Sequence, residues 1–180
     1  WQVLSSTLNY AAALIPEIGR NILPIDDAMK LGYNWIYGPF ELLDQIGAQR
    51  VVERMQKENR QVAPMLLLAA KQQGFYQVID QQLCSLEQEG QYAPINRPAG
   101  VLRFSELRQT LTAQYSNAKA SWFEHDGAAI IEFHSKANAL DSESMDVIRH
   151  ALKQAQQRQL RGVVIHNDFQ HFSCGVNLVA

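Results

Sequence analysis

Apolar residues in the first part of the chain recur at intervals of three and four, which is the spacing of one face of an α-helix. The first stripe comprises Leu4, Leu8, Ala11, Ile15 and Ile18. Because Pro16 lacks a backbone donor, we expect this helix to kink or to end early there. Two later stripes predict helices over residues 48–58 and 61–73. Their expected core side chains are Val51, Val52 and Met55 in the first and Met65, Leu66, Leu68 and Ala69 in the second.

A segment rich in glycine and aromatic residues, residues 32–47, separates these stripes. Gly32 follows a helical run and is expected at its C-cap, whereas Gly38 followed by Pro39 predicts that another helix begins there. The expected buried face of that helix comprises Phe40, Leu43 and Ile46. The pattern therefore predicts a tight corner between two helices.

Four acidic residues lie close to this corner. Asp26 and Asp27 fall in the first turn of the preceding helix, where acids favour the helix dipole. Glu41 and Asp44 lie about one helical turn apart, so they are acid/base candidates or, more simply, solvent-facing residues.

The pattern weakens between residues 75 and 120. Residues 75–95 contain a strand-like run and a Glu89-Gly90 turn, which together predict a short, irregular hairpin. Residues 96–100 are typical of a linker, and Ser105 is expected to cap a short helix after it. Residues 115–120 are small and polar, and we expect the domain boundary there.

The last third of the chain has the pattern of an α/β unit. Two strand-like runs, 121–125 and 128–134, flank Asp126-Gly127, a pair typical of a two-residue hairpin turn. Asp141 is expected to cap a helix over residues 142–158. The expected inward side chains of that helix are Met145, Ile148 and Leu152. Residues 162–166 form a continuous apolar run, which predicts a strand buried on both faces.

Composition narrows the functional classes. The 180 residues are 47% hydrophobic and 19% charged with a net charge of −2, as in an ordinary soluble protein with a core. Nothing in this charge balance favours binding to nucleic acid or to an anionic membrane, and no apolar run reaches the length of a membrane span. Cys84 and Cys174 form no CxxC pair, so reduced thiols and a cytoplasmic location are expected. The five histidines are too dispersed to predict a metal site.

The glycine-rich corner also carries a family resemblance. Residues 32–44, Gly-Tyr-Asn-Trp-Ile-Tyr-Gly-Pro-Phe-Glu-Leu-Leu-Asp, follow Asp-Asp-Ala-Met-Lys-Leu and resemble the C-terminal helical domain of the 3-hydroxyacyl-CoA dehydrogenases. The resemblance implies such a domain over residues 1–115, as a second, non-catalytic copy, because the phrase around the family's catalytic asparagine is absent and Asn9 has the wrong neighbours. NAD would be bound by a preceding domain. Since the chain begins with Trp1, we expect a piece of a longer polypeptide.

A second resemblance covers residues 121–180. Phe-Ser-Cys-Gly-Val-Asn-Leu at 172–178 is similar to the Phe-Ser-Ala-Gly-Ala-Asp-Leu motif of the enoyl-CoA hydratase/isomerase (crotonase) superfamily, and Lys-Ala-Asn-Ala-Leu at 136–140 resembles its Lys-x-Asn-Ala-Leu segment. By position, the N–H of Val176 becomes an oxyanion donor to a thioester. Cys174 and Ala139 become backbone contacts to coenzyme A, and Lys136 becomes a candidate for its phosphates.

Departures from this second motif keep other interpretations open. Cys174 and Val176 replace alanines and Asn177 replaces an acid, and the bulkier Val176 narrows a pocket. From the residues alone, a plain turn explains this glycine-containing segment as well. Cys174 with His171 as a thiol nucleophile and its base is a weaker alternative, because no orienting acid is evident.

The sequence thus predicts a multidomain chain: an all-α domain like the C-terminal domain of 6-phosphogluconate dehydrogenase, then a truncated α/β segment of crotonase type. The resemblances imply a parent enzyme of fatty-acid β-oxidation that oxidises L-3-hydroxyacyl-CoA with NAD and hydrates enoyl-CoA. This piece is expected to be structural, dimer-forming and inactive alone, and a homo-oligomer is left open. The alternatives are a non-enzymatic scaffold, or a CoA isomerase or thioester hydrolase fused to an unrelated helical domain.

Overall fold

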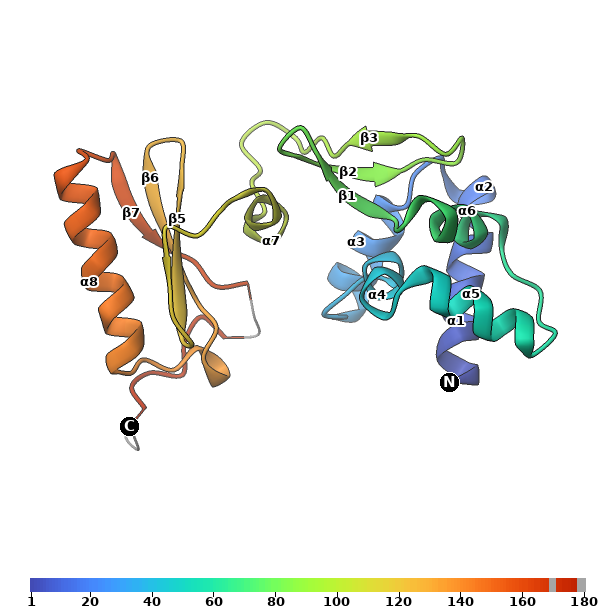
Figure 1. Cartoon of the computed structure of the whole chain (residues 1–180), viewed down its shortest axis with the longest axis horizontal. Coiled ribbons are helices and arrows are strands. Elements are labelled where there is room, and N and C mark those ends of the chain that lie inside the picture. Colours follow the sequence, from blue (N-terminus) through green and yellow to red (C-terminus); the bar gives the residue numbers. More distant parts are fainter. Residues whose placement is uncertain (169–170, 178–180) are drawn as a thin grey trace. The chain divides into compact units, whose positions relative to one another are not determined.

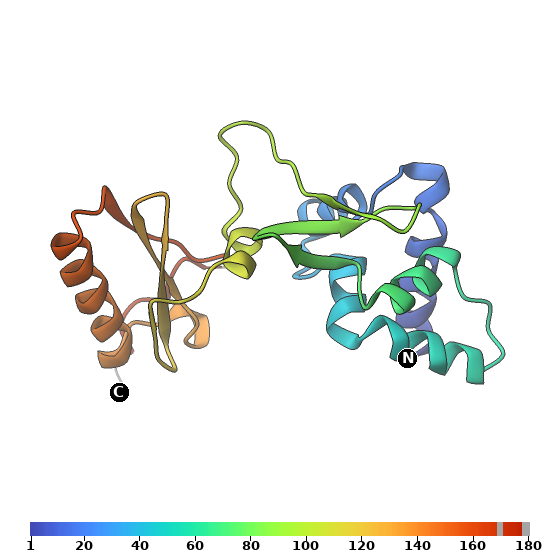
Figure 2. The same ribbon diagram turned by 45° about the horizontal axis from the view of Figure 1, so that its top comes forward.

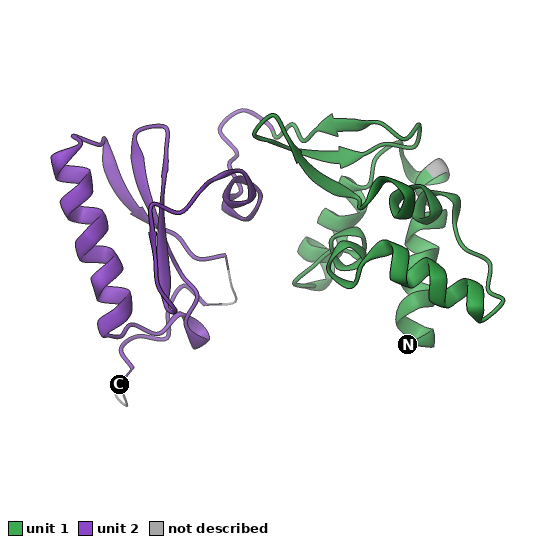
Figure 3. Cartoon of the chain, in the orientation of Figure 1, with its two compact units in different colours: residues 1–97 green, residues 98–180 purple. Residues whose placement is uncertain are grey.

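The structure is a computed structural model that describes residues 1–168 and 171–177. The chain divides into two compact units, residues 1–97 and 98–180, which Figure 3 distinguishes by colour. Within the described residues, no helix has both the length and the apolar character that crossing a membrane requires.

Six helices build most of the first unit (Figure 1). They are α1 (Gln2–Ala13), α2 (Ile15–Ile18), α3 (Leu23–Tyr33), α4 (Pro39–Ile46), α5 (Ala48–Lys57) and α6 (Pro64–Gln72). The break between α1 and α2 confirms the interruption expected near Pro16, and α4 begins at Pro39 as predicted. Helix α3 continues past Gly32, and Asn34, with φ of 56°, takes the left-handed C-cap position instead.

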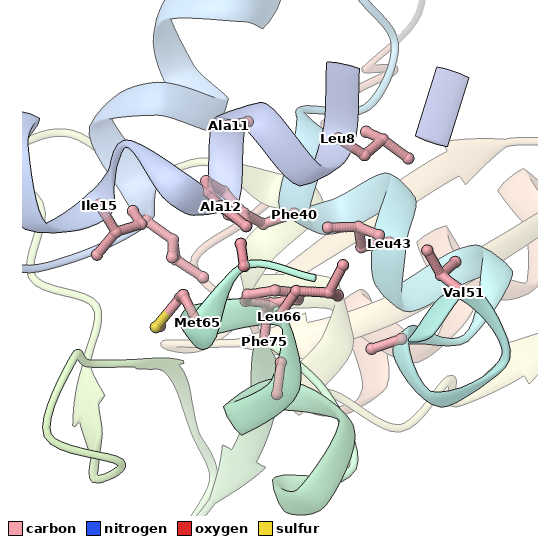
Figure 4. Close-up of a cluster of buried hydrophobic side chains, with 14 of the residues drawn as sticks. Leu8, Ala11, Ala12, Ile15, Phe40, Leu43, Val51, Met65, Leu66 and Phe75 are labelled. Atoms are coloured by element: carbon pink, nitrogen blue, oxygen red, sulfur yellow. The ribbon is translucent and has the colours of Figure 1, made fainter. Parts of the chain in front are cut away.

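The core of the first unit forms where α1, α4, α5 and α6 meet (Figure 4). Phe40, Leu43, Leu66 and Phe75 are fully buried, and the rings of Phe40 and Phe75 lie 4.9 Å apart at a tilt of 53°. This packing confirms the predicted inward faces of α4, α5 and α6 in their main positions. At both ends of the first stripe the prediction is wrong, since Leu4 is 39% exposed and Ile18 is 60% exposed.

A three-stranded antiparallel sheet completes the first unit. Its strands, in spatial order, are β1 (Tyr76–Ile79), β2 (Gln82–Leu86) and β3 (Tyr92–Pro94). Asp80 and Gln81 connect β1 and β2 with φ values of 49° and 60°, a left-handed turn built without glycine. Leu86 of β2 is fully buried in the same core as the helices.

This sheet overturns the predicted fold class. The chain is 45% helix and 20% strand with two sheets, so it is an α/β structure and not an all-α domain followed by a crotonase-type segment. The hairpin expected in residues 75–95 is present, but it belongs to a three-stranded antiparallel sheet, so the first unit is not all-α. Four consecutive residues of β2, 83–86, are buried, and Leu86 packs in the helical core.

The second unit is a four-stranded sheet with one long helix. Its elements are α7 (Phe104–Leu107), η1 (Arg108–Thr110), β4 (Tyr115–Ser116), β5 (Ala120–His125), β6 (Ala128–Phe133), η2 (Lys136–Asn138), α8 (Ser142–Gln157) and β7 (Gly162–Ile165). The strand order is β4-β5-β6-β7, antiparallel except for the parallel pair β6 and β7, which α8 connects. Asp126 and Gly127, with φ of 46° and 70°, form the expected hairpin turn. Figures 1 and 2 both show α8 lying along one face of the sheet.

The buried face of α8 differs from the prediction. The buried residues are Ser144, Val147, Ala151 and Ala155. Met145 and Leu152, which were expected inward, are 40% and 52% exposed. The small side chains of the alanines let the helix approach the large residues of the sheet closely. Likewise β7 is an edge strand, and Val164 is 49% exposed rather than buried on both faces.

The division between the units falls inside the predicted linker, between Arg97 and Pro98. It precedes the boundary expected at residues 115–120, because α7 belongs to the second unit. Phe104 of α7 packs edge-on against Phe123 of β5, with their ring centroids 5.6 Å apart. Ser105 lies within α7, and Arg103 is its N-cap residue.

Candidate functional site

Two segments that lie far apart in the sequence join at one edge of the second sheet. The segment around η2 follows β6 and the segment at 171–177 follows β7, and since these strands are parallel, both segments leave from the same end. The N–H of Cys174 donates to the carbonyl of Ala137 at 3.1 Å. The N–H of Leu140 donates to the carbonyl of Gly175 at 2.9 Å, and the N–H of Asn177 donates to the carbonyl of Leu140 at 2.8 Å.

Val176 lies at the centre of this junction and forms a parallel bridge with Leu140. Both backbone groups of Leu140 bond to the residues on either side of Val176, so the bridge does not use the N–H of Val176. The residue is 68% exposed. Its amide therefore takes no part in the bridge, at the end of the sheet from which both segments leave. Leu178, the last residue of the motif, lies outside the described residues.

The other three predicted site residues belong to the same hydrogen-bonded assembly. Lys136 is exposed in the first turn of η2, and Cys174 is an exposed free thiol whose N–H is engaged by Ala137. Ala139 is half-buried, and its carbonyl accepts a hydrogen bond from the hydroxyl of Ser135 at 2.7 Å. Of the predicted coenzyme A contacts, Lys136 and Cys174 are thus exposed and Ala139 is half-buried.

Asn138 and Ser173 hold the junction together, and neither residue was predicted to do so from the sequence. The Asn138 side chain is buried and donates to the carbonyl of His171 at 3.0 Å, while the Ser173 hydroxyl donates to the carbonyl of Asn138 at 2.7 Å. Ala137 and Asn138 both have φ of 54°. A left-handed alanine costs about 1–2 kcal/mol, and such strain is concentrated at functional segments.

Asn167 supports the junction from the sheet. Its side chain accepts from the N–H of Phe133 at 2.8 Å and donates to the carbonyl of Phe172 at 2.7 Å. It therefore fixes the end of β6 against the segment that carries the motif. No periodicity in the sequence marks this residue, because its partners lie on two other segments.

Three acidic residues of the first unit, Asp26, Glu41 and Asp44, accept hydrogen bonds from backbone amides. Asp44 accepts from the N–H of Phe75 at 2.7 Å and of Tyr76 at 2.8 Å, and burial raises its pKa to about 6. The expectation that Asp44 faces solvent is therefore wrong. Glu41 accepts from the N–H of Gly38 at 2.8 Å and pairs with Lys30.

Asp26 lies in the first turn of α3, as predicted, but its side chain is fully buried. Its carboxylate accepts from the N–H groups of Phe40 at 2.8 Å and Glu41 at 3.1 Å, and from the Tyr76 hydroxyl at 2.7 Å. Burial raises the pKa of Asp26 to about 7, and the nearby Glu41 carboxylate contributes to the increase. Asn9 is engaged in a similar way, since its side-chain oxygen accepts from the N–H of Ala63 at 2.8 Å.

Comparison with known proteins gives a family for the first unit. Residues 2–91 match the family model described as 3-hydroxyacyl-CoA dehydrogenase, C-terminal domain. A "Probable 3-hydroxyacyl-CoA dehydrogenase" of Bacillus subtilis (strain 168) is 30% identical over 181 residues, which is 99% of this chain and 23% of that protein. A "Putative fatty acid oxidation complex trifunctional enzyme" of Rickettsia prowazekii (strain Madrid E) is 26% identical over 98% of this chain and 22% of its own length.

A similarly described protein of Rickettsia felis (strain ATCC VR-1525 / URRWXCal2) is 52% identical over 42 residues, 23% of this chain and 6% of that protein. The chain thus spans less than a quarter of the length of the relatives that it matches. No solved structure matches the chain.

Proposed function

Because the chain belongs to the family of 3-hydroxyacyl-CoA dehydrogenase C-terminal domains, we propose that it is part of a larger enzyme of fatty-acid oxidation. That enzyme would oxidise L-3-hydroxyacyl-CoA with NAD, which a domain outside this chain would bind, and would also hydrate enoyl-CoA. The names of the two relatives that align along nearly the whole chain support the assignment to fatty-acid oxidation. A cytoplasmic location and a homo-oligomer remain predictions.

In this proposal the first unit is a structural copy of the dehydrogenase domain. Three polar side chains that otherwise suit acid/base or substrate-binding work bond to its own backbone. Asn9 holds the start of α6, Asp44 holds the start of β1, and Asp26 holds the start of α4. With these groups engaged, the unit supplies shape and contact surface rather than chemistry.

The second unit, in the same proposal, supplies part of a coenzyme A thioester site of enoyl-CoA hydratase/isomerase type. The N–H of Val176 would donate to the thioester oxygen as negative charge develops there. The backbone at Ala139 and Cys174 would contact coenzyme A, and the ammonium group of Lys136 would pair with its phosphates. The observation that carries this proposal is the Leu140–Val176 bridge, which places the motif beside η2 and does not use the Val176 amide.

Titration of the ¹⁵N-labelled chain with crotonyl-CoA, followed by NMR, tests this site. We expect saturable shifts of the Val176, Ala139 and Cys174 amides. Lys136→Gln should weaken binding roughly two- to fivefold, as expected for one exposed ion pair, whereas Lys153→Gln on the exposed surface of α8 is the matched control. Absence of binding, or equal effects of the two substitutions, would favour the scaffold interpretation over a coenzyme A site.

Turnover assays test whether the chain needs the rest of the enzyme. The chain alone should neither reduce acetoacetyl-CoA with NADH nor hydrate crotonyl-CoA, because the nucleotide-binding residues and a second oxyanion donor are expected elsewhere. Loss of NADH absorbance or of the enoyl absorbance at rates typical of a complete enzyme would contradict the proposal.

A further inference from the structure

The N-terminus of α4 is capped by a side chain from another helix. Gly38 occupies the N-cap position, where Ser, Thr, Asp or Asn ordinarily accepts hydrogen bonds from the first turn. Asp26 of α3 accepts these bonds instead, from Phe40 and Glu41. A Cβ at position 38 would lie 2.3 Å from the carboxyl carbon of Asp26, so the carboxyl group fills the space of the missing side chain.

The same carboxyl group connects the corner to the sheet. The Tyr76 hydroxyl donates to the oxygen of Asp26 that also accepts from Glu41. The backbone of Tyr76 is held in turn by Asp44 of α4. Three elements, α3, α4 and β1, therefore meet at a side chain that has no solvent-exposed surface.

The charges around Asp26 come from each element packed against it. Helix α3 contributes Asp27 and Lys30, α4 contributes Glu41 and Asp44, and β1 contributes Tyr76. Lys30 pairs with Glu41 and lies 4.0 Å from Asp27, which also pairs with Arg97. The cations thus neutralise Glu41 and Asp27, and no cation bonds to Asp26 among the contacts of the described residues.

We propose that the Asp26 carboxyl is a proton-operated lock on the corner between α3 and α4. The protonated form keeps the corner closed, and the ionised form favours a conformer in which water reaches the carboxylate. The protonated group can donate to the Tyr76 oxygen by reversal of their hydrogen bond, so the closed corner accommodates the proton. The ionised group is stabilised by water, which the closed corner excludes.

The direction of the pH effect follows from proton linkage. The closed conformer binds a proton to Asp26 with a pKa of about 7, and a conformer that exposes the carboxyl has the ordinary value near 3.8. Between these values only the open conformer loses its proton, so opening becomes easier as the pH rises. Above about pH 7 both conformers are ionised and the opening equilibrium no longer changes.

Amide hydrogen exchange of the full chain tests the lock. After correction for intrinsic rates, protection of the Phe40 and Glu41 amides should fall by about tenfold per pH unit toward pH 7 and then stay level. Asp26→Asn should remove this dependence, whereas Asp80→Asn, the same change in an exposed turn, should retain it. The core amides of α6 should be more protected at every pH, because the corner opens locally.

Three results would overturn the proposal. They are pH-independent protection in the wild-type chain, the same slope in Asp26→Asn, and exchange of the α6 amides at the rate of the corner. If Asp26→Asn does not fold, the variant Tyr76→Phe tests the proposal instead. Loss of the hydroxyl removes a donor that favours the carboxylate, so the pH at which protection levels off should rise; an unchanged profile would refute the lock.

Discussion

Substitution of Gly38 by alanine tests the packing of the α3–α4 corner directly. The backbone at Gly38 has φ of −67° and ψ of 167°, which alanine adopts without strain, so any cost comes from the collision with Asp26. The new Cβ would lie 2.3 Å from the carboxyl group, far below a van der Waals contact. Asp26 must therefore move away from the N–H groups of Phe40 and Glu41.

The magnitude follows from the bonds that this movement breaks. Each of the two buried donors that is left without an acceptor costs about 1–3 kcal/mol. We expect Gly38→Ala to destabilise the first unit by about 2–6 kcal/mol, a large part of the stability of an ordinary domain. Because the chain has two units, unfolding should be measured by urea titration with hydrogen-exchange mass spectrometry of peptides from residues 1–97.

Gly32→Ala provides the matched control. Gly32 lies inside α3, and a Cβ there meets no atom within 4 Å. Alanine should stabilise this helix by roughly 0.5–1 kcal/mol. In an Asp26→Gly background the three atoms nearest to the new Cβ are absent, including the Cβ of Asp26, so Gly38→Ala should then cost less than about 1 kcal/mol. A change of less than about 1 kcal/mol for Gly38→Ala alone would refute the reasoning.

Three further predictions concern pH, strain and capping. The free energy of unfolding of the first unit should fall by about 4 kcal/mol from Asp26 alone as the pH rises from about 4 to about 7, because the folded state holds the proton of Asp26 more tightly. Urea titrations at several pH values would measure this fall, and a rise in stability would contradict it. Ala137→Gly should stabilise the second unit by about 1 kcal/mol in thermal unfolding by relieving a φ of 54°, whereas Ala139→Gly should not. Asp141→Ala should cost about 1 kcal/mol, since Asp141 accepts from the N–H of Ser144 at 2.9 Å, and Asp146→Ala on exposed α8 is its control; equal effects would argue against the cap.

Features set by adjacent residues were predictable from the sequence. Gly38-Pro39 marks the start of α4, Asp126-Gly127 marks a hairpin turn, and Asp141 marks the start of α8. Each signal acts through the backbone conformation or hydrogen bonds of its own neighbourhood. The structure therefore reproduces all three at the expected positions.

Features that depend on other elements were not predictable in this way. Helix α8 carries two equally periodic stripes, the predicted one and the one that is buried. The buried stripe has the smaller residues, and it faces the sheet because the large side chains of β5 and β6 already fill the space between helix and sheet. The first sheet turns through Asp80 and Gln81 without a glycine to mark it. Asp26 looked like an ordinary acid at a helix start, because its capping role depends on Gly38, the N-cap residue of the following helix. In the candidate site, the motif indicated Val176 and Lys136, but the residues that tie them together, Asn138 and Asn167, became visible only in three dimensions.

The Leu140–Val176 bridge also affects the order in which the second unit folds during synthesis on the ribosome. The β5–β6 hairpin pairs neighbouring residues and can form early, but the segment around Leu140 has no partner until residues 173–177 have been synthesised. During that interval the left-handed Ala137 and Asn138 lack their hydrogen bonds to Cys174, Ser173 and His171, so this part of the nascent chain should remain accessible to chaperones and proteases. Translation pauses placed just after α8 should therefore increase degradation of the second unit more than pauses placed far enough beyond Val176 for the junction to have left the ribosomal exit tunnel.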